Sequence, residues 1–264
     1  MTVRALFHFT AAIFLTGPAI AGTFTFSNTN PIIINDTTNP PTIASPYPST
    51  NQVTGLAGSI VTKVTVELSG FSHGFPSDVD IVLVGPQGQN AVLMGNAGVE
   101  TNASVTNLDL ILDDSAASNL PLDTPLESGT FKPTQRFPFL FNFPPPGPDT
   151  NALMGPFLSN FNGTDPNGAW NLYVVDDTSP DSGVITGGWS LTITTTPLLL
   201  SITRQQTNAI LSWTNAAVGF TLQSTPSLTP PAWSNVIDPV GIISGNYTVT
   251  NAMATNRVFY RLMK

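Results

Sequence analysis

The sequence predicts an all-β fold, and three observations support this prediction. Almost no window of the 264 residues has the 3.6-residue period of an amphipathic helix, whereas short β-branched runs recur between Gly, Pro and Asn. Residues 63–68 alternate as a half-buried strand does, with Val64, Val66 and Leu68 on one side. Hydrophobic residues make up 41% of the chain, which is enough to form buried cores.

Each strand expected in the first part of the chain is a short apolar or β-branched run between turn residues. The predicted strands are residues 23–26, 32–34, 60–68, 79–84, 91–94, 108–112, 171–175 and 189–194. About eight strands of this kind suit a two-sheet jelly roll. Residues 35–55 and 115–168 lack such runs, and we expect them to be surface connections.

A boundary is expected at Thr194-Thr-Thr-Pro197, after which the strand pattern restarts with a separate set of aromatic residues. This boundary makes residues 22–196 the first domain and residues 197–264 the second. The strands predicted in the second domain are residues 198–202, 210–213, 220–223, 247–249 and 258–262. Their alternation suits a small sandwich.

Residues 1–21 have the pattern of a secretory signal peptide. Arg4 precedes an apolar run over residues 5–15, and Ala19-Ile20-Ala21 provides a small-x-small cleavage site. The apolar run is shorter than the ~20 residues that a membrane span needs. We therefore expect a secreted protein, extracellular or periplasmic, without a membrane span after cleavage.

The composition argues against nucleic acid as a partner. The chain has 16 acidic and 8 basic side chains and a formal net charge of -8, so it offers no basic patch that would release phosphate counterions. It has no Cys, so no disulfide can stabilise it, and stability must come from packing or from a metal.

The most informative stretch consists of two strand-like runs, residues 168–177 and 184–193, on either side of an acidic turn. Asp176, Asp177 and Asp181 fall within six residues of this stretch, although only 9% of the chain is charged. We predict a hairpin whose second strand is irregular at Gly187-Gly188.

This stretch resembles the closing motif of the P domain (P/Homo B domain) of subtilisin-like proprotein convertases. The matching residues are Gly168, Trp170, Leu172, Val174, Asp176, Asp181, Gly183, Gly188, Trp189, Ser190 and Leu191. Residues 72–88 resemble a second P-domain motif, with Gly74 in place of the usual Thr and Val79 in place of the usual Leu. The resemblance covers about residues 23–195 and implies a jelly-roll module without the protease domain that normally precedes it.

The second domain resembles the small fibronectin III-like or immunoglobulin-like tail modules of secreted bacterial proteins. The residues that carry this likeness are Leu211-Ser-Trp213, residues 220–224, Trp233 and the terminal Phe259-Tyr-Arg-Leu262. The complete expectation is therefore an all-β chain with a jelly-roll β-sandwich followed by a small sandwich of this kind.

The residue inventory leaves little material for catalysis. After signal removal His73 is the only histidine and no cysteine exists, so a catalytic triad would have to be built on His73. His73 lies inside the motif at residues 72–88, where the resemblance implies a structural residue of the sandwich. We expect no enzymatic activity.

Hard cations are the metals that suit this chain, because oxygen ligands are plentiful while His and Cys are nearly missing. The candidate calcium ligands are Asp78, Asp80, Asp176, Asp177 and Asp181. They form two groups in the sequence, Asp78 with Asp80 and Asp176 with Asp177 and Asp181. In a jelly roll these two groups could meet at one end of the sheets. The alternative is that they are turn residues, because Asp bonds readily to nearby backbone groups.

Four phenylalanines, Phe137, Phe139, Phe141 and Phe143, have period-2 spacing that would place their rings on one side of an extended chain. Exposed, they would form a strip for carbohydrate stacking or protein contact. Buried, they would clamp a loop onto the sandwich.

Together these features predict a secreted, non-catalytic binding or scaffolding protein whose partner is an extracellular protein or a glycan. Two alternatives stay open. The chain could be an accessory module of a subtilisin-like serine endopeptidase system, or a carbohydrate-binding jelly roll.

Overall fold

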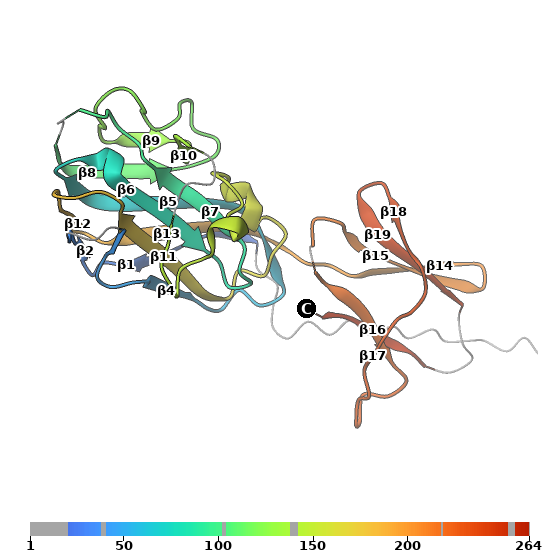
Figure 1. The fold of residues 1–264 in the computed structure, drawn as a ribbon. Helices are drawn as coiled ribbons and strands as arrows, with labels where there is room; N and C mark the ends of the chain where they lie inside the picture. Colours follow the sequence, from blue (N-terminus) through green and yellow to red (C-terminus); the bar gives the residue numbers. More distant parts are fainter. Residues whose placement is uncertain are drawn as a thin grey trace, which may run out of the picture.

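The computed structural model describes residues 21–37, 41–101, 104–137, 142–217, 219–252 and 257–263. These residues form strands throughout with three short 3₁₀ helices, which confirms the all-β class. The chain is divided into a larger body and a smaller body (Figure 1). The predicted signal peptide lies outside the described residues except for its last residue, Ala21.

The larger body is a sandwich of two sheets. One sheet has the order β1 (Gly22–Asn28), β13 (Trp189–Pro197), β5 (Ser59–His73), β12 (Gly183–Ile185) and β2 (Ile32–Ile34), and β8 (Val105–Leu112) and β9 (Gly129–Phe131) extend it from β5. The other has the order β10 (Thr134–Gln135), β7 (Asn90–Gly95), β6 (Val79–Val84), β11 (Gly168–Asp176) and β3 (Thr42–Ile43), with β4 (Ser49–Val53) also on β11.

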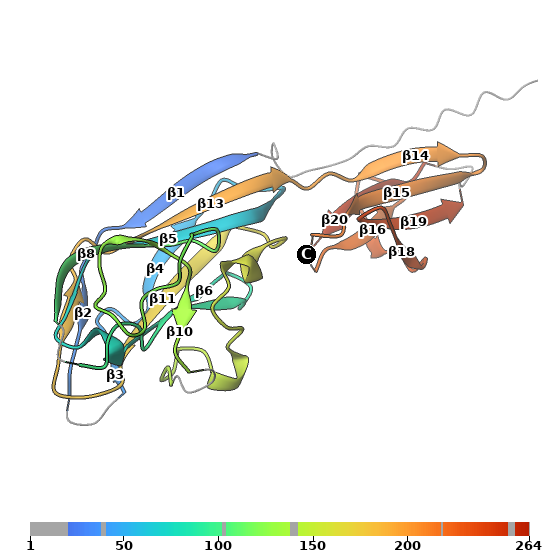
Figure 2. The same ribbon diagram turned by 90° about the horizontal axis from the view of Figure 1, so that it is seen from above.

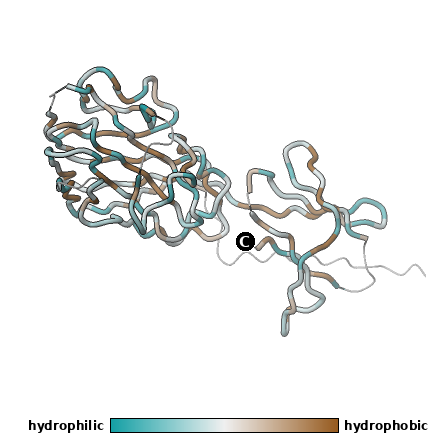
Figure 3. The backbone as a smooth tube through the Cα atoms, in the orientation of Figure 1, coloured by the Kyte–Doolittle hydropathy of each residue, from teal (hydrophilic) through white to brown (hydrophobic). Residues whose placement is uncertain are grey.

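The inward faces of the two sheets share one hydrophobic core. Trp170 of β11 and Trp189 of β13 are fully buried in this core. Each indole has a hydrogen-bond acceptor: Trp170 Nε1 donates to the Pro166 carbonyl at 2.8 Å, and Trp189 Nε1 donates to Ser49 Oγ at 3.0 Å. The most hydrophobic stretches of the chain accordingly follow the central strands (Figure 3).

The prediction of residues 35–55 and 115–168 as surface connections is wrong in part. The first range contains β4, whose Ser49, Asn51 and Val53 are buried. The second contains η2 (Thr150–Ala152) and η3 (Leu158–Phe161), and Phe161 lies in the core. Buried side chains in long connections therefore cover the sandwich and contribute to its packing.

The predicted hairpin across the acidic turn is also wrong. β11 pairs with β6, β3 and β4, whereas β12 and β13 both pair with β5 in the opposite sheet. The acidic turn therefore carries the chain from one sheet to the other. Gly187-Gly188 separates β12 from β13, and Gly188 has a φ of +69° at a point where an added Cβ would lie 2.1 Å from the Asn28 carbonyl oxygen.

The smaller body contains two sheets that pack around a second core. Their orders are β14 (Ser201–Gln205), β15 (Asn208–Thr214), β19 (Asn246–Ala252) and β18 (Val240–Ile243), and β17 (Ser234–Asn235), β16 (Thr221–Thr225) and β20 (Phe259–Met263). The strand expected at residues 198–202 begins only at Ser201. Leu198 and Leu200, which precede it, are buried in the connection between β13 and β14.

The two bodies are joined through β13, which leads directly toward β14 (Figure 2). Leu198 N donates a hydrogen bond to the Gly58 carbonyl at 2.8 Å, and Ile60 of β5 packs in the core of the smaller body. Within the described ranges, no helix is both long and apolar enough to cross a membrane.

Candidate functional site

The candidate site lies at the end of the larger sandwich where β5 and β11 finish and β6 begins. Strand register brings the two acidic groups of the sequence together there, because Asp176 is paired with Val79 and Val175 with Asp80. Asp78 precedes this pairing as the last residue of η1 (Pro76–Asp78). Four of the predicted acids, Asp78, Asp80, Asp176 and Asp177, thus lie around one end of β6 and β11.

The fifth predicted acid, Asp181, comes to this end from the turn between the sheets. A Cβ added to Gly74 would lie 2.4 Å from Asp181 Oδ1, so the backbone at Gly74 packs directly against that carboxylate. A side chain at position 74 would have to displace the Asp181 carboxylate.

His73 links the two sheets at this end. Its Nδ1 accepts a hydrogen bond from Phe75 N at 3.1 Å, which leaves the proton on Nε2, and Nε2 donates to Asp176 Oδ2 at 3.1 Å. Both side chains are buried, at 0% and 1% exposed. Asp176 Oδ1 accepts a further hydrogen bond from Thr178 N at 3.2 Å. Both nitrogens of the His73 ring are therefore occupied inside the protein.

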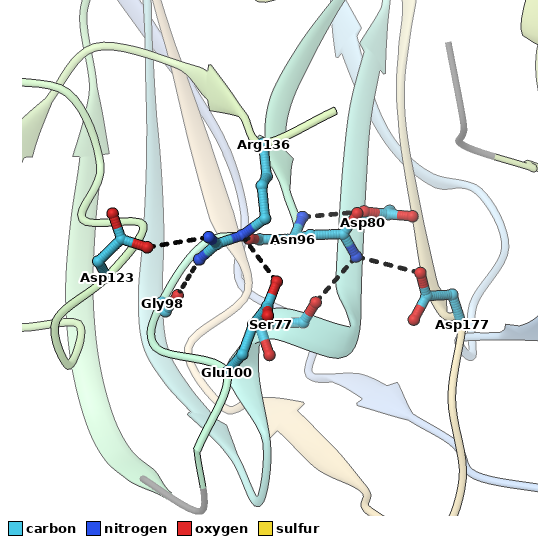
Figure 4. Close-up of polar contacts among 8 residues, drawn as sticks. All are labelled: Ser77, Asp80, Asn96, Gly98, Glu100, Asp123, Arg136 and Asp177. Carbon is cyan, nitrogen blue, oxygen red and sulfur yellow. Dashed lines mark hydrogen bonds and ion pairs between the residues drawn. The ribbon is translucent and has the colours of Figure 1, made fainter. Parts of the chain in front are cut away.

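Asn96, which sequence reasoning missed, is the central polar residue of the site (Figure 4). Its backbone N–H donates to Asp80 Oδ1 at 3.1 Å. Its Nδ2 donates to the Ser77 carbonyl at 2.8 Å and to Asp177 Oδ2 at 3.0 Å. Asn96 has a φ of +50°, a left-handed conformation that Asn tolerates better than most residues.

Arg136 is the cation at the edge of the site, and each of its three guanidinium nitrogens makes a polar contact (Figure 4). It donates to the carbonyls of Asn96 at 3.2 Å and Gly98 at 2.7 Å. It also pairs with Asp123 at 3.0 Å and with Glu100 at 3.3 Å. Its two acidic partners do not belong to the predicted cluster, and both are exposed, at 60% for Glu100 and 89% for Asp123.

Asp78 differs from its neighbours because its carboxylate has no hydrogen-bond or ion-pair partner among the described residues, although only 9% of the residue is exposed. It lines a pocket of about 400 Å³ at the surface. The residues lining this pocket are Phe75, Ser77, Asp78, Asn96, Glu100, Phe137, Asp177 and Thr178.

The electrostatics of the cluster are those of carboxylates without a counter-ion. Burial, followed by the charges of Asp177 and Asp176, raises the pKa of Asp78 from 3.8 to about 7. Burial and then the charge of Asp177 raise the pKa of Asp80 well above its usual value, against the stabilising hydrogen bond from Asn96 N. The cluster therefore favours either protons or another cation.

The predicted phenylalanine strip is not a single surface in the described residues. Phe137 is 45% exposed beside the pocket. Phe143 is 3% exposed and packs with Val82, Val92 and Tyr173, on the outer face of the sheet that contains β6, β7 and β11. Phe137 and Phe143 therefore do not belong to one exposed strip, and Phe143 is buried against the sandwich as the second alternative expects. Phe139 and Phe141 lie outside the described residues.

No group of three or more His, Cys, Asp or Glu side chains in the described part of the chain is arranged so that it could hold a metal ion. The cluster thus has the chemistry of a cation site without a complete set of acidic ligands already in position. Chemically, the arrangement offers oxygen ligands and negative charge, and the histidine beside it is occupied.

Comparisons with protein families, with curated proteins and with solved structures found no match for this chain. The resemblance to the P domain therefore depends on the two sequence motifs alone.

Proposed function

We propose that this chain is a non-catalytic binding or scaffolding protein that acts outside the cytoplasm, with a P-domain-like jelly roll as its larger body. The observation that supports the non-catalytic part is the state of His73. A general base needs a free nitrogen within hydrogen-bond reach of the substrate. Both ring nitrogens of His73 are bonded to the protein, and the side chain is 0% exposed.

A protein partner is favoured by the edge strand β18 of the smaller body. β18 pairs on one side with β19, and no other strand in the described ranges pairs with it. Its Val240, Ile242 and Ile243 are 54%, 63% and 63% exposed, and the preceding Ile237 is 96% exposed. An uncharged edge strand with exposed apolar side chains suits strand addition by another protein.

A glycan is the second candidate partner, and a different surface favours it. A pocket of about 380 Å³ in the larger body is lined by Phe26 and by hydroxyl and amide side chains that include Asn28, Asn30 and Asn51. Asn51 is buried, and its Nδ2 has no hydrogen-bond partner. Amide and hydroxyl groups beside an aromatic ring suit a sugar, which presents hydroxyls and an apolar face.

Three assays test the proposed function. The purified protein should hydrolyse peptide and ester substrates no faster than background, and turnover that is lost in His73→Gln or in a single Ser→Ala variant would contradict the non-catalytic proposal.

A pull-down from culture medium should recover a partner with the wild type and lose it with Ile242→Lys, whereas Ile33→Lys on the larger body serves as the control. Binding on a glycan array that survives Ile242→Lys would favour the glycan instead.

A further inference from the structure

We propose that the pocket between η1 and the end of β11 is a calcium site whose protein ligands include Asp78 and Asp177, with Ser77 and Asn96 beside them. This proposal does not depend on the identity of any binding partner. The bound ion would stabilise the end of the larger sandwich where β5 and β11 finish and β6 begins.

The first observation is the unpartnered carboxylate of Asp78. The residue is nine-tenths buried, it lines the pocket, and no described group donates a hydrogen bond to its side chain or forms an ion pair with it. Buried charged groups in proteins are normally paired or bound to a metal, because burying one alone is costly. A cation in the pocket would supply the partner that the protein itself does not.

The second observation is the position of the Asn96 side-chain amide. Its Nδ2 group bridges the Ser77 carbonyl and Asp177 Oδ2, at 2.8 Å and 3.0 Å. The amide N–H groups thus satisfy two oxygens of different charge, one from η1 and one from the residue that follows β11 (Figure 4). A metal ion could contact the same two oxygens, because carbonyl and carboxylate oxygens are both calcium ligands.

The third observation is that, among the described residues, no basic side chain pairs with Asp78 or Asp177. Arg136 is held by Glu100, Asp123 and two backbone carbonyls. His73 has no free nitrogen, because Nδ1 accepts from Phe75 N and Nε2 donates to Asp176. Asp78 and Asp177 thus both line a pocket whose lining residues include no Lys or Arg.

The donor set selects calcium among the common metals. The pocket offers carboxylate, carbonyl and amide oxygens and no sulfur, and its adjacent imidazole is occupied, which argues against zinc and copper. Calcium accepts six to eight oxygens in irregular arrangements and takes some of them from water, whereas magnesium requires a near-ideal octahedron. A site with two carboxylates and several neutral oxygens therefore fits calcium better.

Thermal unfolding with calcium chloride against EGTA tests the proposal, with isothermal titration calorimetry as the direct measure of binding. For calcium at about 100 times its Kd, mass action predicts a rise in Tm of about 5 to 10 °C for a protein of this size. Calorimetry should give one ion per chain. Magnesium chloride at the same concentration should give a much smaller rise.

Asp78→Asn and Asp177→Asn keep the shape of each side chain and remove its charge, so each should reduce the calcium-dependent rise to below about 1 °C. Glu127→Gln is the matched control, because it removes an exposed acid that does not line the pocket and should keep the full rise. Circular dichroism in EGTA establishes that each variant is folded. The proposal is overturned if the wild type binds no calcium, if both pocket variants keep the full rise, or if magnesium acts equally well.

Discussion

Replacing Asp78 by Asn should raise the stability of the metal-free protein at neutral pH. Burial and the charges of Asp177 and Asp176 raise the pKa of Asp78 from 3.8 to about 7. A carboxyl with a higher pKa in the folded chain holds its proton more tightly there, so its contribution to stability is fully present below pH 3.8. This contribution is lost as the pH rises to about 7, the folded-state value. Asn stays neutral throughout.

The size of the effect follows from the change in pKa. A rise of about three units corresponds to about 4 kcal/mol of unfolding free energy for a carboxyl that is cut off from water. The pocket leaves part of Asp78 in contact with solvent, which screens the neighbouring charges, so we reduce this figure by about half. The variant should therefore exceed the wild type by only about 0.5 kcal/mol at pH 4 and by about 2 kcal/mol at pH 8.

Urea unfolding in EGTA, followed by tryptophan fluorescence at pH 4, 6 and 8, measures this difference. Glu127→Gln should differ from the wild type by the same amount at all three pH values, because its side chain is exposed outside the pocket. An Asp78→Asn advantage that does not change between pH 4 and pH 8, or a variant that is less stable at pH 8, would refute the account of the pocket as uncompensated negative charge.

Three further predictions concern the frame that holds the site. His73→Ala should lower the free energy of unfolding by about 3 kcal/mol in urea titrations, because it leaves a buried carboxylate and a backbone N–H without their partner; a loss below about 1 kcal/mol would contradict this. Gly188→Ala should cost more than Gly55→Ala in the same assay, because an added Cβ meets a backbone oxygen at 2.1 Å in the first and open space in the second, although both glycines have positive φ. Trp189→Phe should cost about 1 kcal/mol more than Trp213→Phe, because only the Trp189 indole N–H has a hydrogen-bond partner to lose; equal losses would contradict the assignment.

Continuous apolar runs could be located from the sequence, whereas strands with polar inward residues could not. The runs at Ile32–Ile34 and Val79–Val84 were predicted with the bounds that the structure has. Ser49–Val53 was missed because two of its three inward side chains are Ser49 and Asn51, which do not produce a hydrophobic alternation. Val240–Ile243 was missed because this strand is short, exposed and interrupted by Gly241, so it shows no alternation of buried and exposed residues.

The acids of the site could be found from composition, but their partners could not. Asp78 and Asp177 stood out because charge is scarce in this chain. Asn96 and Arg136 act largely through backbone carbonyls and N–H groups, and such contacts leave no residue pattern. The available signal was the Gly95-Asn-Ala-Gly98 turn directly after a buried run, since Asn between glycines suits a positive φ. The hairpin error has a similar cause, because alternation specifies a strand and not the sheet it joins.

The choice of hydrogen-bond donors around the acids is the strongest physical reason to expect a cation from outside. His73, Asn96 and the backbone N–H of Thr178 are neutral donors, so they reduce the cost of burying Asp80, Asp176 and Asp177 without changing the net charge. The Arg136 guanidinium pairs with Glu100 and Asp123 and with two backbone carbonyls instead. In the metal-free protein, burial and then this repulsion raise the pKa of Asp78, and protonation relieves both. Calcium competes with that proton for the same oxygens, and its binding should therefore release protons at neutral pH, as calorimetry in buffers of different ionisation enthalpy can measure.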